Sequence, residues 1–348
     1  MNPTALMILL LSLALGTTTV MMSHHWLLAW IGLEINTLAI IPLMTKSPHP
    51  RAIEAATKYF LTQASASALI LFSTTMNAWL TGEWSITSTM NPLSSTAFSM
   101  ALMLKLGLAP LHFWMPEVLQ GIPLSTGLIL STWQKIAPMT LLLQTSHLLN
   151  LNLLILMGLT SILVGGWGGI NQTQIRKIMA FSSIGHLGWM IIILKFDPKL
   201  TLFTFFIYIM MTTAMFLSLM SVASTKMTEI STSWPKTPIL MTTTMLILLS
   251  LAGLPPLTGF SPKLLITLEL IKQNTLTLAA LTILASLMAL FFYTRLTYIS
   301  ILTLPPNTMN SSIHWRMNKI KSLTAIFTSV ALLFFPLTPH SFFYHMET

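Results

Sequence analysis

Apolar segments of about 20 residues follow one another along almost the entire chain, and a helix of that length crosses the hydrocarbon core of a bilayer. The 348 residues include only 17 Lys+Arg and 8 Asp+Glu, whereas a soluble protein of this length carries roughly 87 charged side chains. A soluble fold is therefore excluded, and the sequence predicts an all-α polytopic membrane protein. The chain has no cysteine, which excludes disulfides, thiolate catalysis and iron–sulfur clusters. Any redox centre is expected on a partner.

The apolar pattern predicts about eleven transmembrane helices, joined by short connections into a single transmembrane domain. The expected spans are Pro3–Met22, Trp26–Met44, Lys58–Leu80, Thr96–Trp114, Pro123–Gln144, Leu148–Gly169, Gln174–Leu194, Leu200–Ser224, Pro238–Phe260 continuing into Ile271, Thr275–Ile299 and Ser322–Thr338.

An internal repeat is visible in two spans that prolines interrupt. Gly107-Leu-Ala-Pro-Leu111 with Phe113 and Pro116 matches Gly253-Leu-Pro-Pro-Leu257 with Phe260 and Pro262, at a spacing of 146 residues. Each motif lies in the fourth span of a block of five. We therefore expect two inverted five-helix repeats with proline-broken helices, at residues 1–147 and 148–300, followed by a linker and one last helix at residues 301–348.

The cations in the connections predict the orientation, because loops on the inner side of a membrane carry an excess of Lys and Arg. Eleven fall on the side of the N-terminus: Lys46, Arg51, Lys58, Arg176, Lys177, Lys226, Lys236, Arg295, Arg316, Lys319 and Lys321. Three fall on the other side: Lys195, Lys199 and Lys272. This places the N-terminus inside and the C-terminus outside. Cations so dispersed form no nucleic-acid groove.

Three lysines, Lys105, Lys135 and Lys263, have no connection to occupy and are expected within the membrane. A lysine at that depth costs about 2.5–3.5 kcal/mol on insertion scales, so it needs water, a partner or loss of its proton. Each also lies within five residues of a proline (Pro110, Pro138 and Pro262), whose missing N–H opens the helical backbone. Lysines in such surroundings can hold and release protons. Glu34 lies mid-span and is the carboxylate expected to act on Lys105.

Each of these residues also has a structural interpretation. Glu34 could be a protonated side chain that a neighbouring hydroxyl satisfies, and Lys105 could extend to the membrane interface. His112 and His186 are either proton relays or satisfied core histidines. No metal site is expected, because His24 and His25 lack further ligands.

Four segments together resemble the antiporter-like subunits of proton-pumping NADH:quinone oxidoreductase, respiratory complex I. They are Gly32-Leu-Glu34, Lys105-x-Gly-x-x-Pro-x-His112-x-Trp-x-Pro116, the Arg176–His186 stretch with its Ala-Phe-Ser-Ser-Ile core, and Leu251–Phe260 with Lys263. The resemblance covers essentially the whole chain and is greatest to mitochondrial versions of vertebrates, with a mammal expected. It departs from the fourteen spans common in the family by lacking three at the N-terminus.

The resemblance implies a proton-translocating core subunit that couples electron transfer on other subunits to proton pumping. Glu34 would modulate Lys105, Lys135 would be the central relay, and Lys263 would face a neighbouring antiporter-like subunit. Small membrane subunits would lie on the Glu34 side, with accessory subunits and lipids around the chain. Arg176 and Lys177 either bind a headgroup such as that of cardiolipin or set the topology.

The same resemblance implies no cofactor in this chain, with NAD, FMN, iron–sulfur clusters and ubiquinone on partner subunits. The expected location is the mitochondrial inner membrane, with the N-terminus on the matrix side and the C-terminus on the intermembrane-space side. Two alternatives remain: a free-standing cation/proton antiporter, and a purely structural membrane-arm subunit.

Overall fold

The computed structural model describes residues 2–46, 48–234, 237–255, 257–302 and 322–333, and within these ranges every regular element is a helix. The chain folds into two compact units. The first comprises Met1–Ser161 and Met190–Pro198, and the second comprises Ile162–Trp189 and Lys199–Thr348. Five residues that the sequence analysis named lie outside the described residues: Lys236, Pro256, Arg316, Lys319 and Lys321. Positions 334–338 of the last expected span lie outside them as well.

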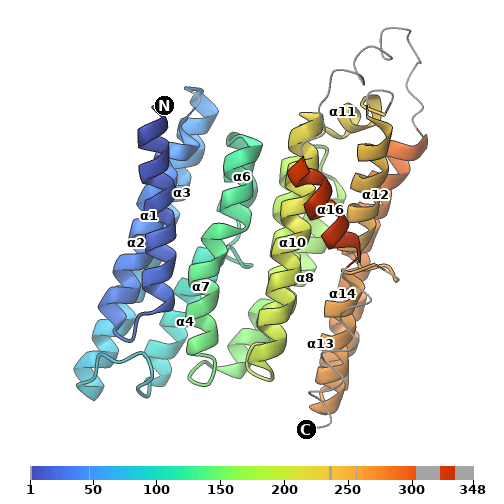
Figure 1. The fold of residues 1–348 in the computed structure, drawn as a ribbon. Coiled ribbons are helices and arrows are strands. Elements are labelled where there is room, and N and C mark those ends of the chain that lie inside the picture. The colour runs from blue at the N-terminus through green and yellow to red at the C-terminus, as the bar shows by residue number, and fades with distance from the viewer. Residues whose placement is uncertain (1, 47, 235–236, 256, 303–321, 334–348) are drawn as a thin grey trace. The chain divides into compact units, whose positions relative to one another are not determined.

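The first unit begins with three long helices that lie side by side in Figure 1. They are α1 (Pro3–Met21), α2 (Trp26–Met44) and α3 (Pro50–Thr81). Helices α1 and α2 cross where glycines remove the side chains: a Cβ on Gly16 would lie 2.9 Å from the Gly32 carbonyl oxygen. Small residues allow this close approach in membrane bundles.

Two interrupted helices follow in the first unit. The first consists of α4 (Pro92–Leu106) and α5 (Trp114–Gly121), and the second of α6 (Leu124–Ser131) and α7 (Trp133–Gln144). Helix α4 ends because Gly107 adopts a left-handed conformation with φ +78, and its N–H donates to the Met103 and Leu104 carbonyls. The sequence predicts a proline-broken helix in the span Thr96–Trp114, and the structure ends the first half at Leu106 and begins the second at Trp114.

The interruption between α6 and α7 lies at Thr132, which has φ −115 and ψ −69. Pro138 is inside α7 and does not end the helix. Because a proline ring crowds the carbonyl one turn earlier, its effect on the backbone falls near residue 134. The opened turn is consequently on the N-terminal side of Lys135.

Helices α8 (Leu151–Ile170) and α9 (Ile175–Ile193) each contribute to both units. The second unit continues with α10 (Pro198–Val222), α11 (Met227–Thr232), α12 (Pro238–Ala252), α13 (Phe260–Lys272), α14 (Leu276–Leu302) and α16 (Ser322–Leu333). Gly253, with φ +83, ends α12 as Gly107 ends α4. Helix α12 begins and ends, and α13 begins, 146 residues after the corresponding points of α4 and α5.

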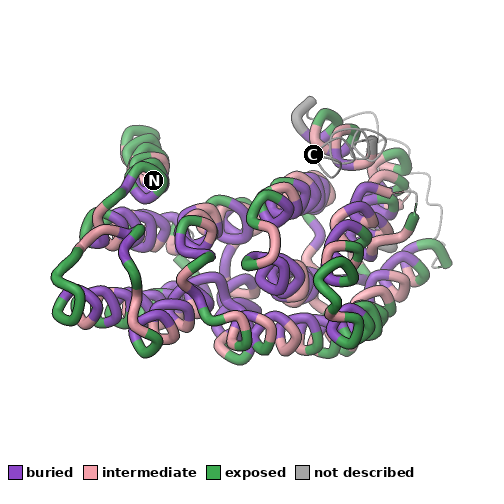
Figure 2. Tube along the Cα trace, turned by 90° about the horizontal axis from the view of Figure 1, so that it is seen from below, coloured by how far each residue is buried: buried purple, intermediate pink, exposed green. Residues whose placement is uncertain are grey.

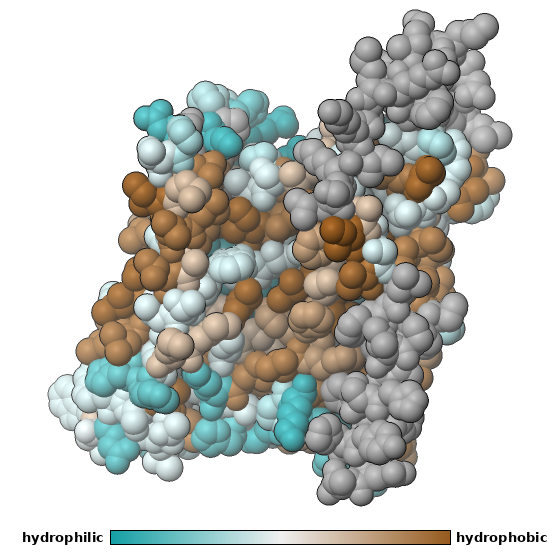
Figure 3. Space-filling model, viewed as in Figure 1, coloured by the Kyte–Doolittle hydropathy of each residue, from teal (hydrophilic) through white to brown (hydrophobic). Residues whose placement is uncertain are grey.

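Five helices within the described ranges are long and apolar enough to cross a membrane: α1, α2, α8, α10 and α14. On the face of the first unit that Figure 3 shows, apolar residues form a band with hydrophilic residues at both ends. Helix α1 is largely exposed (Figure 2), with Met7, Ile8, Leu11 and Leu15 all more than half exposed. In a bilayer these side chains meet lipid or another helix, so their exposure does not conflict with stability.

Candidate functional site

A small buried cavity of ≈ 10 Å³ lies within the first unit. Side chains from α2, α3, α4, α6 and α7 line it, together with Trp114 at the start of α5. Lys105 and Lys135 are both among the lining residues. The structure therefore brings two of the three predicted intramembrane lysines to one cavity.

Lys105 is in the last turn of α4, directly before the break at Gly107. The residue is 6% exposed, and its Nζ has no hydrogen-bond partner among the described residues. A cation at the C-terminal end of a helix is favoured by the helix dipole. The indole N–H of Trp114 donates to the Leu104 carbonyl at 3.1 Å, so this freed acceptor is already satisfied.

Lys135 is in the first turn of α7 and is 3% exposed. Its backbone N–H donates to the Thr132 carbonyl at 3.3 Å, across the opened turn. The neighbouring Gln134 donates from Nε2 to the Asn36 carbonyl of α2 at 3.1 Å. This bond joins α7 to α2 beside the lysine.

Glu34 is on α2 and half-buried, and its carboxylate accepts a hydrogen bond from the Thr37 hydroxyl at 2.9 Å. It is near enough for its charge to act on Lys105 and on Tyr59. Within the described part of the chain no ion pair of 4.0 Å or less joins Glu34 to Lys105. The two groups thus interact electrostatically without direct contact.

His112 lies in the irregular segment between α4 and α5 and is 7% exposed. Its ring centroid lies 4.4 Å from that of Phe113, and its carbonyl accepts from the Met115 N–H at 3.0 Å. His112 is not among the residues that line the cavity of the two lysines.

A second cavity, of ≈ 20 Å³, lies within the second unit and is lined by Lys263 and His186. Lys263 is in the first turn of α13, and its Nζ donates to the Ala252 carbonyl at 2.7 Å. The break between α12 and α13 thus supplies an acceptor for this lysine. The ring of His186 lies 6.0 Å from that of Tyr208.

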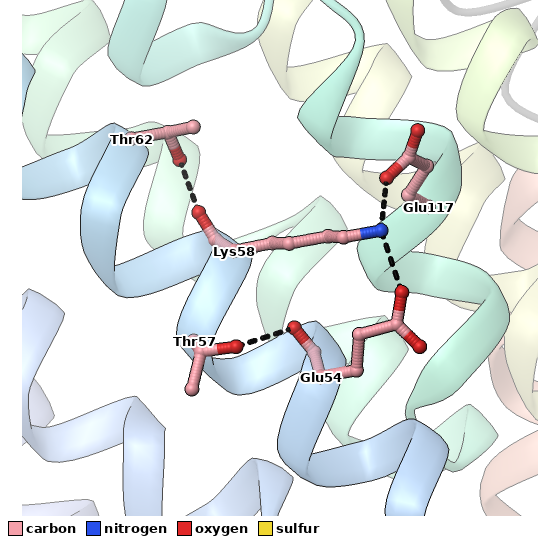
Figure 4. Close-up of polar contacts among 5 residues, drawn as sticks. All are labelled: Glu54, Thr57, Lys58, Thr62 and Glu117. Carbon is pink, nitrogen blue, oxygen red and sulfur yellow. Dashed lines mark hydrogen bonds and ion pairs between the residues drawn. The ribbon is translucent and has the colours of Figure 1, made fainter.

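The sequence analysis missed one cluster of charges, which Figure 4 shows. Lys58 Nζ lies 2.7 Å from a carboxylate oxygen of Glu54, one turn earlier on α3, and 2.7 Å from one of Glu117 on α5. The four-residue spacing of Glu54 and Lys58 could have indicated their pairing. The contact with Glu117 could not have been found, because α5 reaches α3 only after the break. Since all three side chains are exposed, these ion pairs contribute little stability.

The described residues contain no group of three or more His, Cys, Asp or Glu that could hold a metal ion. The chemistry that this arrangement supports is proton transfer between side chains. A helical membrane bundle, with lysines buried at the breaks of its helices, defines the class of antiporter-like ion-translocating membrane proteins.

The chain belongs to the NADH:quinone oxidoreductase/Mrp antiporter transmembrane family, whose model matches residues 23–289. Residues 290–342 match the model for the C-terminus of NADH dehydrogenase subunit 2. The family resemblance drawn from the motifs is thereby confirmed.

Vertebrate relatives match over almost their whole length. NADH-ubiquinone oxidoreductase chain 2 of Aquarana catesbeiana is 72% identical, over 97% of this chain and 98% of the relative. The protein of the same name from Carassius auratus is 59% identical over the same shares. The expected vertebrate kinship is confirmed, and the expected mammalian source stays a prediction.

Solved structures show the same fold. A chain of respiratory complex I from Thermus thermophilus superposes with a TM-score of 0.81 and 26% identity, over 94% of this chain and 78% of that one. A chain of the Mrp complex from Dietzia sp. has a TM-score of 0.80 and 18% identity, over 86% and 61%. At that identity the Mrp likeness concerns the fold alone.

Proposed function

We propose that this chain is a proton-translocating, antiporter-like core subunit of the membrane arm of a NADH:ubiquinone oxidoreductase. The observation that carries the proposal is the burial of Lys105 and Lys135 at one cavity, next to two helix breaks, in a chain 72% identical to a NADH-ubiquinone oxidoreductase chain 2. The chain is a translocase subunit without a redox centre. NAD, FMN, iron–sulfur clusters and ubiquinone belong to its partners.

In this proposal charge arriving from neighbouring subunits changes the separation of Glu34 and Lys105. The proton affinity of Lys105 responds, because a nearby carboxylate favours the ammonium form. Lys135 exchanges protons with Lys105, and Lys263 acts as the terminal lysine. His112 and His186 are candidate relays, and the position of His186 on the cavity of Lys263 supports that role.

The proposed architecture is two inverted five-helix repeats and one further helix. Counting each interrupted helix as a single span gives eleven crossings for the described helices, with α11 too short to count. The equal 146-residue offsets at the two broken helices support the repeat. Isolated antiparallel β-bridges also support the repeat. In the first unit one joins His25, between α1 and α2, to Ser85, between α3 and α4. In the second unit the equivalent bridge joins Gln174, between α8 and α9, to Lys226, between α10 and α11.

The proposed location is the mitochondrial inner membrane, with the N-terminus in the matrix and the C-terminus in the intermembrane space. Its partners are other membrane-arm subunits: an antiporter-like neighbour near Lys263 and small membrane subunits on the Glu34 side. Accessory subunits and lipids, including cardiolipin near Arg176 and Lys177, complete the surroundings.

Replacement of Lys105 or Lys135 by methionine tests the relay. Methionine keeps most of the side-chain volume and removes the titratable amine, so proton pumping linked to quinone reduction should fall at least about 100-fold, as expected for loss of a proton-transfer group. The measurement is pumping and turnover in the assembled enzyme. Lys46→Met, at an exposed cation in a connection, is the matched control.

The alternatives give different results. A free-standing antiporter would exchange sodium or potassium for protons when the purified chain alone is placed in liposomes. A structural spacer would assemble and pump normally with both methionine replacements. Normal pumping in Lys105→Met and Lys135→Met would therefore rule out the relay.

A further inference from the structure

Thr258 lies in the irregular segment between α12 and α13 and is 1% exposed. Its hydroxyl donates a hydrogen bond to the Ala331 carbonyl of α16, 73 residues further along the chain, and also lies 3.2 Å from the Met211 sulfur of α10. Most hydroxyls of the described helices bond to a carbonyl three or four residues earlier in the same helix, as Thr244 bonds to Met241 at 2.8 Å. The Thr258 hydroxyl, which is outside a helix, instead joins the break to α16.

The carbonyl of Thr258 contacts the start of α13. It accepts from the Ser261 N–H at 3.2 Å and from the Ser261 hydroxyl at 2.8 Å. Lys263 is in the same turn, and its Nζ donates to the Ala252 carbonyl at the end of α12. A continuous set of contacts therefore runs from α16 through Thr258 to the turn that carries Lys263.

Close backbone packing leaves this break little room to adjust. A Cβ on Gly259, the residue after Thr258, would overlap the Ser250 carbonyl oxygen in the last turn of α12. A Cβ on Gly253 would lie 2.8 Å from Lys263 Nζ. Because tightly packed groups transmit a displacement to their neighbours, a shift of Thr258 is expected to move the start of α13 and Lys263 with it.

Helix α16 packs on the second unit through small side chains. Thr324, Thr328 and Ala331 are buried, and their spacing of four and three residues places them on one face of the helix. This helix lies against α10 and α12 (Figure 1). Small residues let helix backbones approach closely, which brings the Ala331 carbonyl within reach of Thr258.

The first unit has a corresponding contact. The hydroxyl of Thr160 on α8, which also bonds to Leu156 in its own helix, lies 3.3 Å from the Ala109 carbonyl in the break between α4 and α5. Helix α8 follows the first proposed repeat and α16 follows the second. Each break is thus bound by the long helix that comes next after its repeat. The match to the transmembrane family ends at residue 289, so α16 lies outside the part of the chain that this family shares.

We propose that α16 holds the second helix break in place through the bond between Thr258 and Ala331, and that Thr258 is a positioning residue for Lys263. The positioning role rests on the proposed function, since it takes Lys263 as the terminal lysine of the relay. Thr258 exchanges no proton in this scheme. Loss of its hydroxyl removes the bond to α16, so the start of α13 can shift and Lys263 can leave the Ala252 carbonyl.

The test compares Thr258→Val with Thr258→Ser in the assembled enzyme. Valine keeps the shape of the side chain and removes the hydroxyl, whereas serine keeps the hydroxyl and loses a methyl group. Proton pumping linked to quinone reduction should fall at least about 10-fold in Thr258→Val, because misplacing a reacting group by about 1 Å costs up to about 100-fold in rate. Thr258→Ser should pump like the unmodified enzyme. Normal pumping in Thr258→Val, or an equal loss in both variants, would overturn the proposal.

Thr244→Val is the matched control. Thr244 is on α12 and 3% exposed, and its hydroxyl bonds within its own helix. The replacement removes a buried hydroxyl from the same broken helix without removing a bond to another helix, so pumping should not change. Equal losses in Thr244→Val and Thr258→Val would contradict the role of α16.

A map of the assembled enzyme gives a measurement that does not depend on activity. The proposal expects the bond between Thr258 and Ala331 in the unmodified enzyme, and loss of the contact between Lys263 and Ala252 in Thr258→Val. A map of the unmodified enzyme in which Thr258 does not contact α16 would overturn the proposal, even where Thr258→Val does not assemble.

Lys263→Met separates this proposal from the proposed function. Loss of pumping in Lys263→Met, together with normal pumping in Thr258→Val, overturns the role of α16 and leaves the relay standing. Normal pumping in Lys263→Met overturns the place of Lys263 in the relay, and with it the positioning role of Thr258.

Discussion

At the scale of single residues, Lys105 and Lys263 show two ways to accommodate an ammonium group beside a helix break. Lys105 Nζ faces a cavity without a protein partner in the described part of the chain, whereas Lys263 Nζ binds the Ala252 carbonyl. That bond depends on Gly253, because a Cβ at this position would lie 2.8 Å from Lys263 Nζ. The glycine therefore serves both the backbone, at φ +83, and the lysine.

Replacement of Gly253 by alanine should consequently disturb Lys263 as well as the backbone. The left-handed conformation costs a residue with a Cβ about 1–2 kcal/mol, and the methyl group would displace the ammonium from Ala252. We expect a lower thermal stability of the assembled enzyme and reduced proton pumping.

Gly82→Ala is the matched control for this prediction. Gly82 has φ +76, yet a Cβ there would meet nothing within 4 Å. It should lose similar stability with no loss of pumping. Equal pumping by the two variants would show that the contact between Gly253 and Lys263 has no functional role.

At the scale of helices, the sequence predicted which helices are interrupted but not the residue at which each interruption begins. The motif around Pro110 indicated an interrupted helix, and the break begins three residues earlier, at Gly107, because this glycine adopts a left-handed conformation that ends α4. Pro138 lies inside α7 and does not end it, and the irregular residue before Lys135 is Thr132.

The candidate site could be predicted only in part, for a similar reason. Lys105 and Lys135 can be identified from the sequence as candidate site residues, because a charged side chain within an apolar, membrane-spanning segment is costly unless it has a function or a partner. Asn36 and Gln63 are single amides within such runs, and only the packing of α2, α3 and α4 shows that they share a cavity. Glu117 is likewise recognisable as a partner of Lys58 only in three dimensions.

Helix α11 offers a prediction about pH. The Glu229 carboxylate accepts hydrogen bonds from the Thr225 backbone N–H, from the Thr225 hydroxyl at 3.0 Å and from the Lys226 N–H at 3.1 Å. These bonds, that from the Thr225 N–H foremost, lower the pKa of Glu229 below its ordinary value of 4.5. Their stabilisation is therefore complete above that value and is lost as the pH falls through the lowered pKa.

We expect amide hydrogen exchange in residues 225–230 to be slow at neutral pH and to accelerate as the pH falls through the lowered pKa of Glu229, after correction for the intrinsic effect of pH. In Glu229→Gln the exchange should be faster at neutral pH and should lack this transition. A transition of unchanged size in Glu229→Gln would assign it to another group.

At the scale of the whole molecule, the proposed orientation of the chain in the membrane rests on the loop cations alone. Labelling of introduced cysteines can test it, because the chain contains no cysteine of its own. Lys46 and Glu83 are both exposed and lie at opposite ends of α3, within the first unit. The excess of cations places Lys46 on the matrix side, so Glu83 should face the intermembrane space.

Single cysteines at these two positions test the orientation. In mitochondria stripped of their outer membrane, a membrane-impermeant maleimide should label Glu83→Cys at once, and should label Lys46→Cys only after the inner membrane is opened. Labelling in denaturant provides the control for coverage by partner subunits, since both variants must then react fully. The reverse order would invert every span, and with it the side on which Lys58, Glu54 and Glu117 meet water. That result would also reassign the cations of the connections, because eleven of the fourteen would then face the intermembrane space.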